Sequence, residues 1–494
     1  MATFTTISQL REFKKAFEAN SQGVTDVQSL SDGRALSMVG VENTMVSMTA
    51  TQEALKFLNK MERKPVNNVV SMFNILEGYG DNGEGSFVSE MANAQLKDAE
   101  ITRERAVIKF MAEAYRVSKV LSEETTIEDP ELVQMNASIM RILFSAANDI
   151  WYGDESINPY SWNGFYKTAE LAGNVVDAEG EVPAISLFKE LATEIQISTS
   201  IGKIIGGLAD TAYMPLAIKA VIENYFVNSK EFVIPSNAPQ GNYANIGYFI
   251  PGLIGAPLKD GKLQFETDLP MRNYNKGVPT VRNPAWISNH ALPKYIEGKT
   301  HELAPDPCTF TATNTGATIS GSKWKSGDVV DVNAAASKVG YRVVAGNEYG
   351  RSQASVIVLS SANLVAGHGV NLSITPAATG EPTTYFEIYR ETTPGNGDYK
   401  FVTKVKNIGS PTAYQDINNY RPGTDIIVMG QFDSQPNSMQ RTYAMYELLP
   451  MVQTKFPQTV ANQRTLNGMV EWYASLVINA PKKFWVIKNV PAKI

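Results

Sequence analysis

The sequence is poor in the side chains that build most catalytic and metal sites. It contains one cysteine, Cys308, and three histidines, His290, His301 and His368, among 494 residues. One cysteine excludes an intrachain disulfide and a metal cage made of thiolates. Three imidazoles leave little material for metal binding or acid–base chemistry. The composition therefore excludes a disulfide scaffold and gives an enzyme little support.

Charge and long hydrophobic runs are also scarce. Asp, Glu, Lys and Arg make up 19% of the residues, and the formal net charge is −6. Gripping nucleic acid requires a cationic surplus that neutralises phosphates, so this balance argues against that role. The longest apolar region, residues 248–258, is short and broken by proline and glycine, which predicts no membrane span. The first residues lack a basic segment before an apolar stretch, so we expect no secretion signal.

Known chemical motifs are incomplete. Residues 255–262 come nearest to a phosphate-binding loop, but Leu263 stands where Ser or Thr must hold magnesium. Residues 81–84 lack the spacing of a calcium loop. The sequence contains neither the nucleophile elbow of hydrolases nor a His-x-x-x-His pair. Carboxylate pairs for sugar hydrolysis stay open, because their required separation is spatial.

The remaining candidate groups have simple interpretations. His301 lies in a proline-rich linker and is interpreted as solvated, whereas His368, between two glycines, is interpreted as a turn residue. The acidic residues within 123–131 are interpreted as solvated charges near a helix start, not as metal ligands. We therefore predict no catalytic, metal-binding or cofactor-binding residues, and no cofactor.

The first hundred residues contain segments without an evident core of their own. Apolar residues at helical spacing predict a short amphipathic helix over 7–17, and residues 21–51 are expected to form an extended arm. Residues 66–76 and 87–92 are strand-like and flank a glycine-rich connector, residues 77–86. This pattern predicts a long hairpin, which is marginal alone in water. Its supporting surface lies in the same chain or in a neighbouring one.

Clear helix signals follow. Asp129 is suited to capping a helix that Pro130 opens, and apolar residues then recur at three- and four-residue steps to Ile150. This pattern predicts a structural spine helix. The pattern over 105–121 also suits a helix better than a strand. From Trp151 onward, short helices alternate with short strands such as 211–214, which predicts a mixed α/β domain.

The composition changes near Pro305, and helix signals disappear until about Met439. Short strand candidates there have the spacing of a β-sandwich: 309–313, 329–332, 341–347, 354–359, 370–374, 385–390, 399–405 and 413–416. Residues 341–352 resemble a strand and turn of fibronectin type III and related immunoglobulin-like modules, and residues 385–390 resemble its partner strand. Strand patterns at 470–479 and 484–487 then predict that returning chain completes an earlier domain, so that the sandwich is an insertion.

The order of these parts resembles a major capsid protein of tailed bacteriophages, which has the Hong Kong 97 type fold. Several segments are similar to those of large phages with contractile tails: 54–65 before the hairpin, 149–154 at the end of the spine helix, 210–215, 446–450, 480–483 and 487–490. The resemblance covers most of residues 50–494. It implies that residues 105–121 are an extended strand of the peripheral domain, against the local helix pattern.

The resemblance implies an α+β phage capsid fold with an inserted all-β immunoglobulin-like sandwich. The expected parts are an N-terminal arm (1–60), an extended hairpin loop (61–98), a peripheral domain with the spine helix (99–150 and 465–494), an axial domain (151–303 and 424–464) and the inserted domain (304–423).

The implied function is structural and not enzymatic. Many copies are expected to form hexamers and pentamers of an icosahedral head shell around double-stranded DNA, without sequence-specific binding and without a membrane. Portal and auxiliary or decoration proteins are the expected partners, and the location is the virion, after assembly in the host bacterial cytoplasm. Two alternatives are a tail or adhesion protein with a fibronectin-like module, and a carbohydrate-active enzyme with an appended sandwich.

Overall fold

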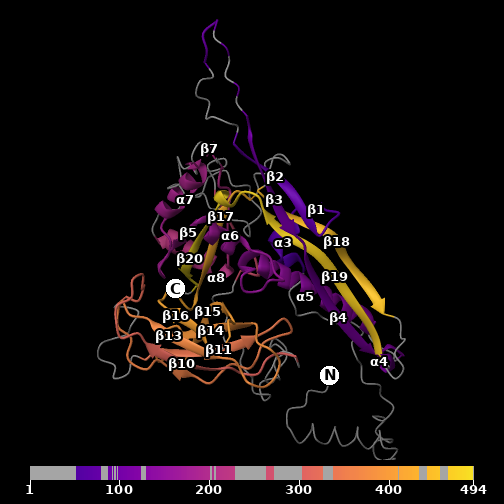
Figure 1. Cartoon of the computed structure of the whole chain (residues 1–494), viewed down its shortest axis with the longest axis vertical. Coiled ribbons are helices and arrows are strands. Elements are labelled where there is room, and N and C mark those ends of the chain that lie inside the picture. Colours follow the sequence, from indigo (N-terminus) through magenta and orange to yellow (C-terminus); the bar gives the residue numbers. More distant parts are fainter. Residues whose placement is uncertain are drawn as a thin grey trace, which may run out of the picture.

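The chain has a mixed α+β architecture with three packed regions and one projecting ribbon (Figure 1). The computed structural model describes residues 52–78, 87–91, 93, 96, 98–123, 129–197, 199–200, 203–204, 207–228, 263–271, 303–325, 338–409, 411–432, 442–456 and 465–492. None of the helices in this part of the chain combines the length and the apolar composition that a membrane span needs. The expected helix over 7–17 and the arm over 21–51 lie outside the described residues.

The first region is a four-stranded sheet covered on one face by a long helix. Its strands, in spatial order, are β1 (Arg63–Pro65), β18 (Tyr443–Phe456), β19 (Thr465–Ile478) and β4 (Lys109–Ser118). The helix is α5 (Pro130–Tyr152), and α4 (Lys119–Glu123) precedes it. The carboxylate of Asp129 accepts the backbone N–H of Glu131, and Pro130 occupies the first turn. The predicted spine helix and its cap are confirmed.

The second region is a five-stranded sheet with helices on both faces. Its strands, in spatial order, are β5 (Val175–Asp177), β20 (Phe484–Pro491), β17 (Thr424–Gly430), β8 (Thr211–Met214) and β9 (Gln264–Thr267). One face packs on α6 (Phe165–Ala172), and the other packs on α7 (Ile185–Ile197) and α8 (Leu216–Asn228). Two short strands, β6 (Thr199–Ser200) and β7 (Lys203–Ile204), form a separate pair. The alternation of helices and strands expected after Trp151 is present.

The third region consists of two sheets packed face to face, which we call the two-sheet unit. One sheet has the order β10 (Thr309–Asn314), β13 (Val370–Thr375), β16 (Thr412–Asp416). The other has the order β12 (Val358–Leu359), β11 (Gly340–Gly346), β14 (Tyr385–Glu391), β15 (Tyr399–Lys406). Residues of both inner faces form one buried cluster that includes Cys308. The expected pairing of 341–347 with 385–390 is confirmed by the β11–β14 register.

Two of the strands expected in this unit are short or lie outside the described residues. Only Val358 and Leu359 of the expected 354–359 strand pair with β11. Before them, the hydroxyl groups of Ser352 and Ser355 accept N–H groups of β11 in place of strand carbonyls. The expected strand 329–332 lies outside the described residues.

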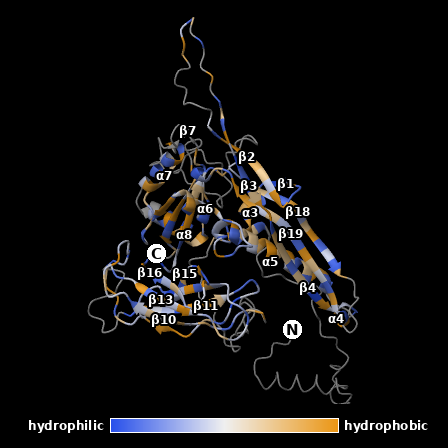
Figure 2. Ribbon diagram, in the orientation of Figure 1, coloured by the Kyte–Doolittle hydropathy of each residue, from blue (hydrophilic) through white to orange (hydrophobic). Residues whose placement is uncertain are grey.

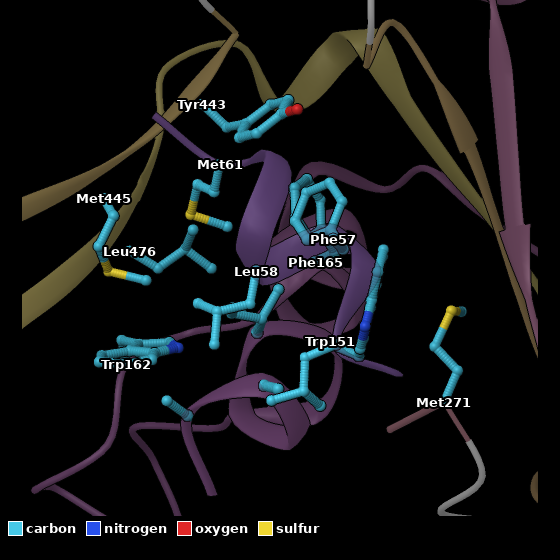
Figure 3. Packing of buried hydrophobic residues seen from close by; sticks show 14 of the residues in the cluster. Phe57, Leu58, Met61, Trp151, Trp162, Phe165, Met271, Tyr443, Met445 and Leu476 are labelled. Atoms are coloured by element: carbon cyan, nitrogen blue, oxygen red, sulfur yellow. The ribbon is translucent and has the colours of Figure 1, made fainter. Parts of the chain in front are cut away.

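A cluster of aromatic side chains joins the four-stranded and the five-stranded sheet, which together with their helices we call the body. Phe57, on the short helix α3 (Lys56–Lys60) that follows the turn Gln52–Ala54, lies 4.7 Å from Trp151 and 5.1 Å from Tyr213 between ring centroids. Figure 3 shows Phe57 beside Phe165 and Trp151, with Leu58 and Met61 facing the sheet residues Met445 and Leu476. Because such rings bury large apolar areas, this cluster holds helices and strands from distant parts of the chain together.

The structure corrects the helix that local periodicity predicts over 105–121. This stretch forms the end of β3 (Glu100–Val107), then β4, and only its last residues enter α4. The pattern misleads because β4 has apolar residues on both faces: Tyr115 is buried under α5, whereas Phe110 packs on Tyr473 on the opposite face. The strand that the family resemblance implies is the one present.

Two returning strands lie in other sheets than the expected division implies. Strand β18 pairs with β19 in the four-stranded sheet, although 424–464 was expected in the axial domain. Strand β20 pairs with β17 in the five-stranded sheet, although 465–494 was expected in the peripheral domain. Both strands are central in their sheets, so pairing partners and not sequence proximity decide the division.

Candidate assembly surface

The projecting ribbon is built by two antiparallel strands, β2 (Val70–Gly78) and β3. Its base is anchored, because Ala106 and Ile108 belong to a small buried cluster with Ala444, Tyr446 and Val477 of β18 and β19. Phe73 adds a ring contact to Tyr446, at 5.8 Å between centroids. Beyond this base the ribbon extends away from both body sheets (Figure 1). Contacts within the same chain therefore fix the base of the ribbon, and the rest of the ribbon projects from the two sheets.

The structure corrects the second strand of the expected hairpin. The partner of β2 is Glu100–Val107 and not 87–92, since Val70 pairs with Val107 and Leu76 with Ile101. No strand is assigned to the described residues 87–91. Residues 100–107 alternate less clearly in polarity, but Ala106 gives them a buried anchor, whereas Phe87 and Met91 are almost fully exposed. Burial at the base, which the local pattern does not reveal, selects the strand.

One face of the ribbon carries an exposed row of cross-strand pairs, which we call the ribbon ladder. Its pairs are Val70–Val107, Met72–Arg105, Asn74–Arg103 and Leu76–Ile101. Met72 is 66% exposed and Ile101 64% exposed, and the three other apolar side chains are also open to solvent. The guanidinium of Arg103 donates to the Asn74 side chain at 3.2 Å, which orders the polar rung. Exposed apolar side chains on both sides of an ordered polar rung are typical of an interaction surface.

Among the described residues between β2 and β3, several apolar side chains are exposed too. The side chains of Phe87, Met91 and Leu96 are essentially fully accessible in the chain alone. Hydrophobic residues follow hydrophilic ones along this projection in Figure 2. An isolated chain gains no burial from these side chains, so the ladder and this segment together mark the surface that another molecule is best placed to cover.

Sequence reasoning identified the projection but missed the residues of the ladder. It placed the second strand too early, so Ile101, Arg103 and Arg105 were not assigned to the hairpin. The available signal was the run of β-branched residues at 101, 102 and 107, interrupted by charges. This signal favours an edge ribbon with one open face, in which charged and apolar residues share that face.

The structure describes only some of the candidate chemical groups. In the described ranges, no group of three or more His, Cys, Asp or Glu side chains is placed to hold a metal ion. Of the acidic cluster, Asp129 caps α5, and Glu131 accepts from Tyr115 and pairs with Lys455. His368 lies in the loop before β13, as expected. His290, His301 and the loops 81–84 and 255–262 lie outside the described residues.

Comparison with known proteins shows similarity along nearly the whole chain. The major capsid protein of Staphylococcus phage S25-3 is 24% identical over 489 residues, which cover 96% of this chain and 94% of that relative. The major capsid protein of Staphylococcus phage K matches to the same extent. No family model matches the chain. These relatives are named as components of a shell, in agreement with the structural and non-enzymatic function expected from the sequence.

The comparison with solved structures also finds matches along nearly the whole chain. A structure from Microbacterium phage Oxtober96 covers 94% of this chain and 99% of its own, with a TM-score of 0.46 and 6% identity. The capsid of a native GTA particle covers 93% and 97%, with a TM-score of 0.45 and 9% identity. An encapsulin complex from Synechococcus elongatus covers 94% and 95%, with a TM-score of 0.44 and 8% identity.

Proposed function

We propose that this chain is a structural shell protein that completes its fold by binding copies of itself. More specifically, it acts as the major capsid protein of a tailed phage and is located in the virion. The full-length similarity to phage major capsid proteins supports this proposal. The observation that carries it is the ribbon ladder, an exposed apolar surface that is held away from the body by an anchored base.

The energetic argument concerns the burial of this surface. Fully burying a Val, Leu, Ile or Met side chain contributes about 1.5–3 kcal/mol, and the ladder offers five such side chains: Val70, Met72, Leu76, Ile101 and Val107. A stable interface buries about 1,600 Å² in total, which a ribbon lying across a neighbour can supply together with its connecting segment. Repetition of one such contact around closed symmetry produces rings and shells.

The expected partners follow from this role. Copies assemble into hexamers and pentamers, and the shell encloses double-stranded DNA without reading its sequence. The net charge of −6 suits a shell protein that does not bind the DNA phosphates tightly. Portal and auxiliary or decoration proteins are the remaining proposed partners, and no membrane is involved.

We also propose that the two-sheet unit, within residues 304–423, is an inserted immunoglobulin-like domain. Its support is the two-layer packing around one core and the pairing of β11 with β14. The chain before and after it lies in one sheet, since β8 pairs with β17. The proposed peripheral domain then joins residues 99–150 to 442–478, and the axial domain joins 151–303 to 424–432 and 484–492.

The test is a pair of charge substitutions on the ladder. We expect Leu76→Glu with Ile101→Glu to give a folded chain that no longer forms hexamers or shells, because both carboxylates would have to be desolvated at the contact. Leu171→Glu on α6 is the matched control, since Leu171 is 70% exposed on the body. Electron microscopy and sedimentation report assembly. Wild-type shells from the double variant would overturn the proposal, and elongated fibres from the parent chain would favour a tail protein.

A further inference from the structure

The seam between the two-sheet unit and the five-stranded sheet is organised around Asp177, at the end of β5. Its Oδ1 atom accepts the side-chain amide of Asn489 at 2.7 Å and the backbone N–H of Glu179 at 2.9 Å. Its Oδ2 atom accepts Lys323 from the two-sheet unit. The Asp177 side chain is only 11% exposed, so these partners replace water. A carboxylate of the body thus binds the unit through a charged hydrogen bond.

Strand β20 contributes the second half of the seam. Asn489 accepts the backbone N–H of Arg421 on its Oδ1 atom at 2.9 Å and donates to the carbonyl of Asn419 at 2.9 Å. The neighbouring Lys488 donates to the side chain of Asn419 at 2.6 Å. The segment 419–421 is the exit of the unit, whereas Lys323 lies early in it. Asp177 and Asn489, which bond each other, therefore hold the unit at two points far apart in its sequence.

Backbone conformation singles out the same place. Among the described residues other than glycine, positive φ angles occur at Glu179 (54°), Asn418 (63°) and Asn489 (59°). Two of them make contacts across the seam, because Glu179 pairs with Lys325 and Asn489 accepts the backbone N–H of Arg421. Asn418 lies within the unit, directly before Asn419, and donates to the carbonyl of Lys323. Such conformations cost free energy for residues with a side chain and persist where surrounding contacts require them. Their convergence indicates a built junction and not an incidental contact.

We propose that Asp177 and Asn489 form a lock that fixes the orientation of the two-sheet unit on the body. Without these side chains, the unit would keep its two chain connections, the Lys325–Glu179 ion pair and the bond from Lys488 to Asn419, and we expect this smaller set to let it move as a hinged module. With them, its outer surface is presented at one fixed angle. This inference does not depend on the capsid function, because it concerns the relation of two parts of one chain.

The experiment measures that orientation directly in the full chain. Spin labels are placed on Leu171→Cys in α6 and Ile408→Cys in the unit, both well exposed, in a Cys308→Ala background. We expect a narrow distance distribution in this parent and a broad one after Asp177→Ala with Asn489→Gly, since glycine keeps the positive φ at 489. The control is Asp398→Ala, which removes a solvent-exposed pair with Lys400 inside the unit. An equally narrow distribution in the lock variant would refute the proposal.

A second variant and a second readout separate hinging from unfolding. Lys323→Ala removes the contact with Asp177 from the side of the unit, while the bonds of Asn489 to Asn419 and Arg421 and the strands β5 and β20 stay unchanged. Hydrogen exchange should then rise about tenfold at the seam amides of Ala178, Gly180 and Arg421, as expected for loss of local protection. Exchange in β8 and β17 should stay at the parent level. If seam exchange is unchanged in Lys323→Ala, the lock is contradicted.

Discussion

Trp151 donates its indole N–H to Oδ2 of Asp268 across 2.8 Å, although 117 residues separate them in the chain. The indole lies in the last turns of α5, and the carboxylate follows β9 at the edge of the five-stranded sheet. Burial raises the pKa of Asp268, while the Trp151 hydrogen bond and the backbone amides of Phe57 and Lys56 oppose that rise. One acceptor therefore connects the spine helix, the short helix α3 and the second sheet.

Substitution of Asp268 should separate its hydrogen bonding from its charge. We expect Asp268→Ala to lower the free energy of unfolding by about 1–3 kcal/mol, because the buried indole N–H loses its acceptor. Asp268→Asn keeps an acceptor oxygen and should cost clearly less. Urea unfolding followed by tryptophan fluorescence measures both variants. Equal losses in the two would show that the bond to Trp151 contributes little.

Asp268 and Asp177 should have opposite effects on the pH dependence of stability. Burial raises the pKa of Asp268, so its native form keeps a proton longer than the unfolded chain, and its contribution falls as pH rises through 3.8 to the native pKa. For Asp177, burial is outweighed by hydrogen bonds from Lys323 and Asn489, which lower its pKa. The contribution of Asp177 to stability is complete above pH 3.8, the ordinary pKa of the carboxyl group. It is lost as the pH falls from there through the lower native pKa.

The measurement compares thermal unfolding of the wild type with Asp268→Asn and Asp177→Asn between about pH 3 and pH 6. On acidification, the stability advantage of the wild type over Asp177→Asn should shrink. The stability of the wild type relative to Asp268→Asn should instead rise as the pH falls. The same direction for both would contradict the assignment of these environments.

Phe57 should be a major contributor to the stability of the body. Its ring is fully buried and contacts Trp151, Phe165, Tyr213, Phe432 and Tyr443. Removing such a ring costs about 3–5 kcal/mol through lost transfer energy and the cavity that remains. We expect Phe57→Ala to show this loss in urea unfolding, and Phe57→Leu a smaller one. A loss below 1 kcal/mol, at the order of magnitude of surface changes, would mean that the cluster repacks.

The two-sheet unit contains a buried ion pair that should respond asymmetrically to substitution. Arg390 lies 2.6 Å from Asp416, both side chains are almost fully buried, and Tyr341 also donates to Asp416 at 2.8 Å. Asp416→Ala leaves the guanidinium without its counter-charge and should cost about 3–5 kcal/mol. Adding Arg390→Met should restore part of the loss. Denaturant unfolding of Asp416→Ala, of Arg390→Met and of the double variant gives the coupling, with the exposed-pair variant Asp398→Ala as a control near zero.

Cys308 offers a probe of the same unit. Burial raises the pKa of its thiol to about 12, and the side chain is 3% exposed in the sandwich core. Since only the thiolate reacts with disulfide reagents, we expect almost no labelling of the native chain at mildly alkaline pH. Labelling should become complete in denaturant, and its rate below the transition should report opening of the unit. Rapid stoichiometric labelling of the native chain would contradict the burial of Cys308.

Local signals were sufficient where an element is specified by adjacent residues. Asp129 and Pro130 predict the start of α5 because a cap and a fixed φ act within one turn, and the helix begins there. The strand 211–214 followed by Pro215 is equally local, and β8 and α8 occupy these positions. The alternation of β19 also predicts its strand, because the face with Val470, Trp472, Ala474 and Leu476 is buried in the same core cluster as α5.

The misassigned parts depend on distant partners. Strand β4 is extended because β19, some 350 residues later, pairs with it from Lys109 to Ser118. The ribbon strand β3 is selected by burial against β18 and β19, and no pattern within residues 87–107 encodes that contact. For the candidate surface, the projection could be predicted but its ladder could not, because a ladder is defined by register across two strands and the register was unknown.

The pairing of β8 with β17 has a consequence for how the polypeptide is made. Tyr213 lies opposite Val428, and the ribosome adds more than two hundred residues between them. At about 5–20 residues per second, the edge of β8 waits roughly 10–40 s for its neighbour during synthesis. The nascent chain therefore has an open strand edge while the two-sheet unit is being synthesised, because the last strand of that unit, β16, ends at Asp416 and β17 begins at Thr424. An open edge can pair with other chains and aggregate. Chaperone binding to this edge, or translation without pauses over this interval, would reduce that loss.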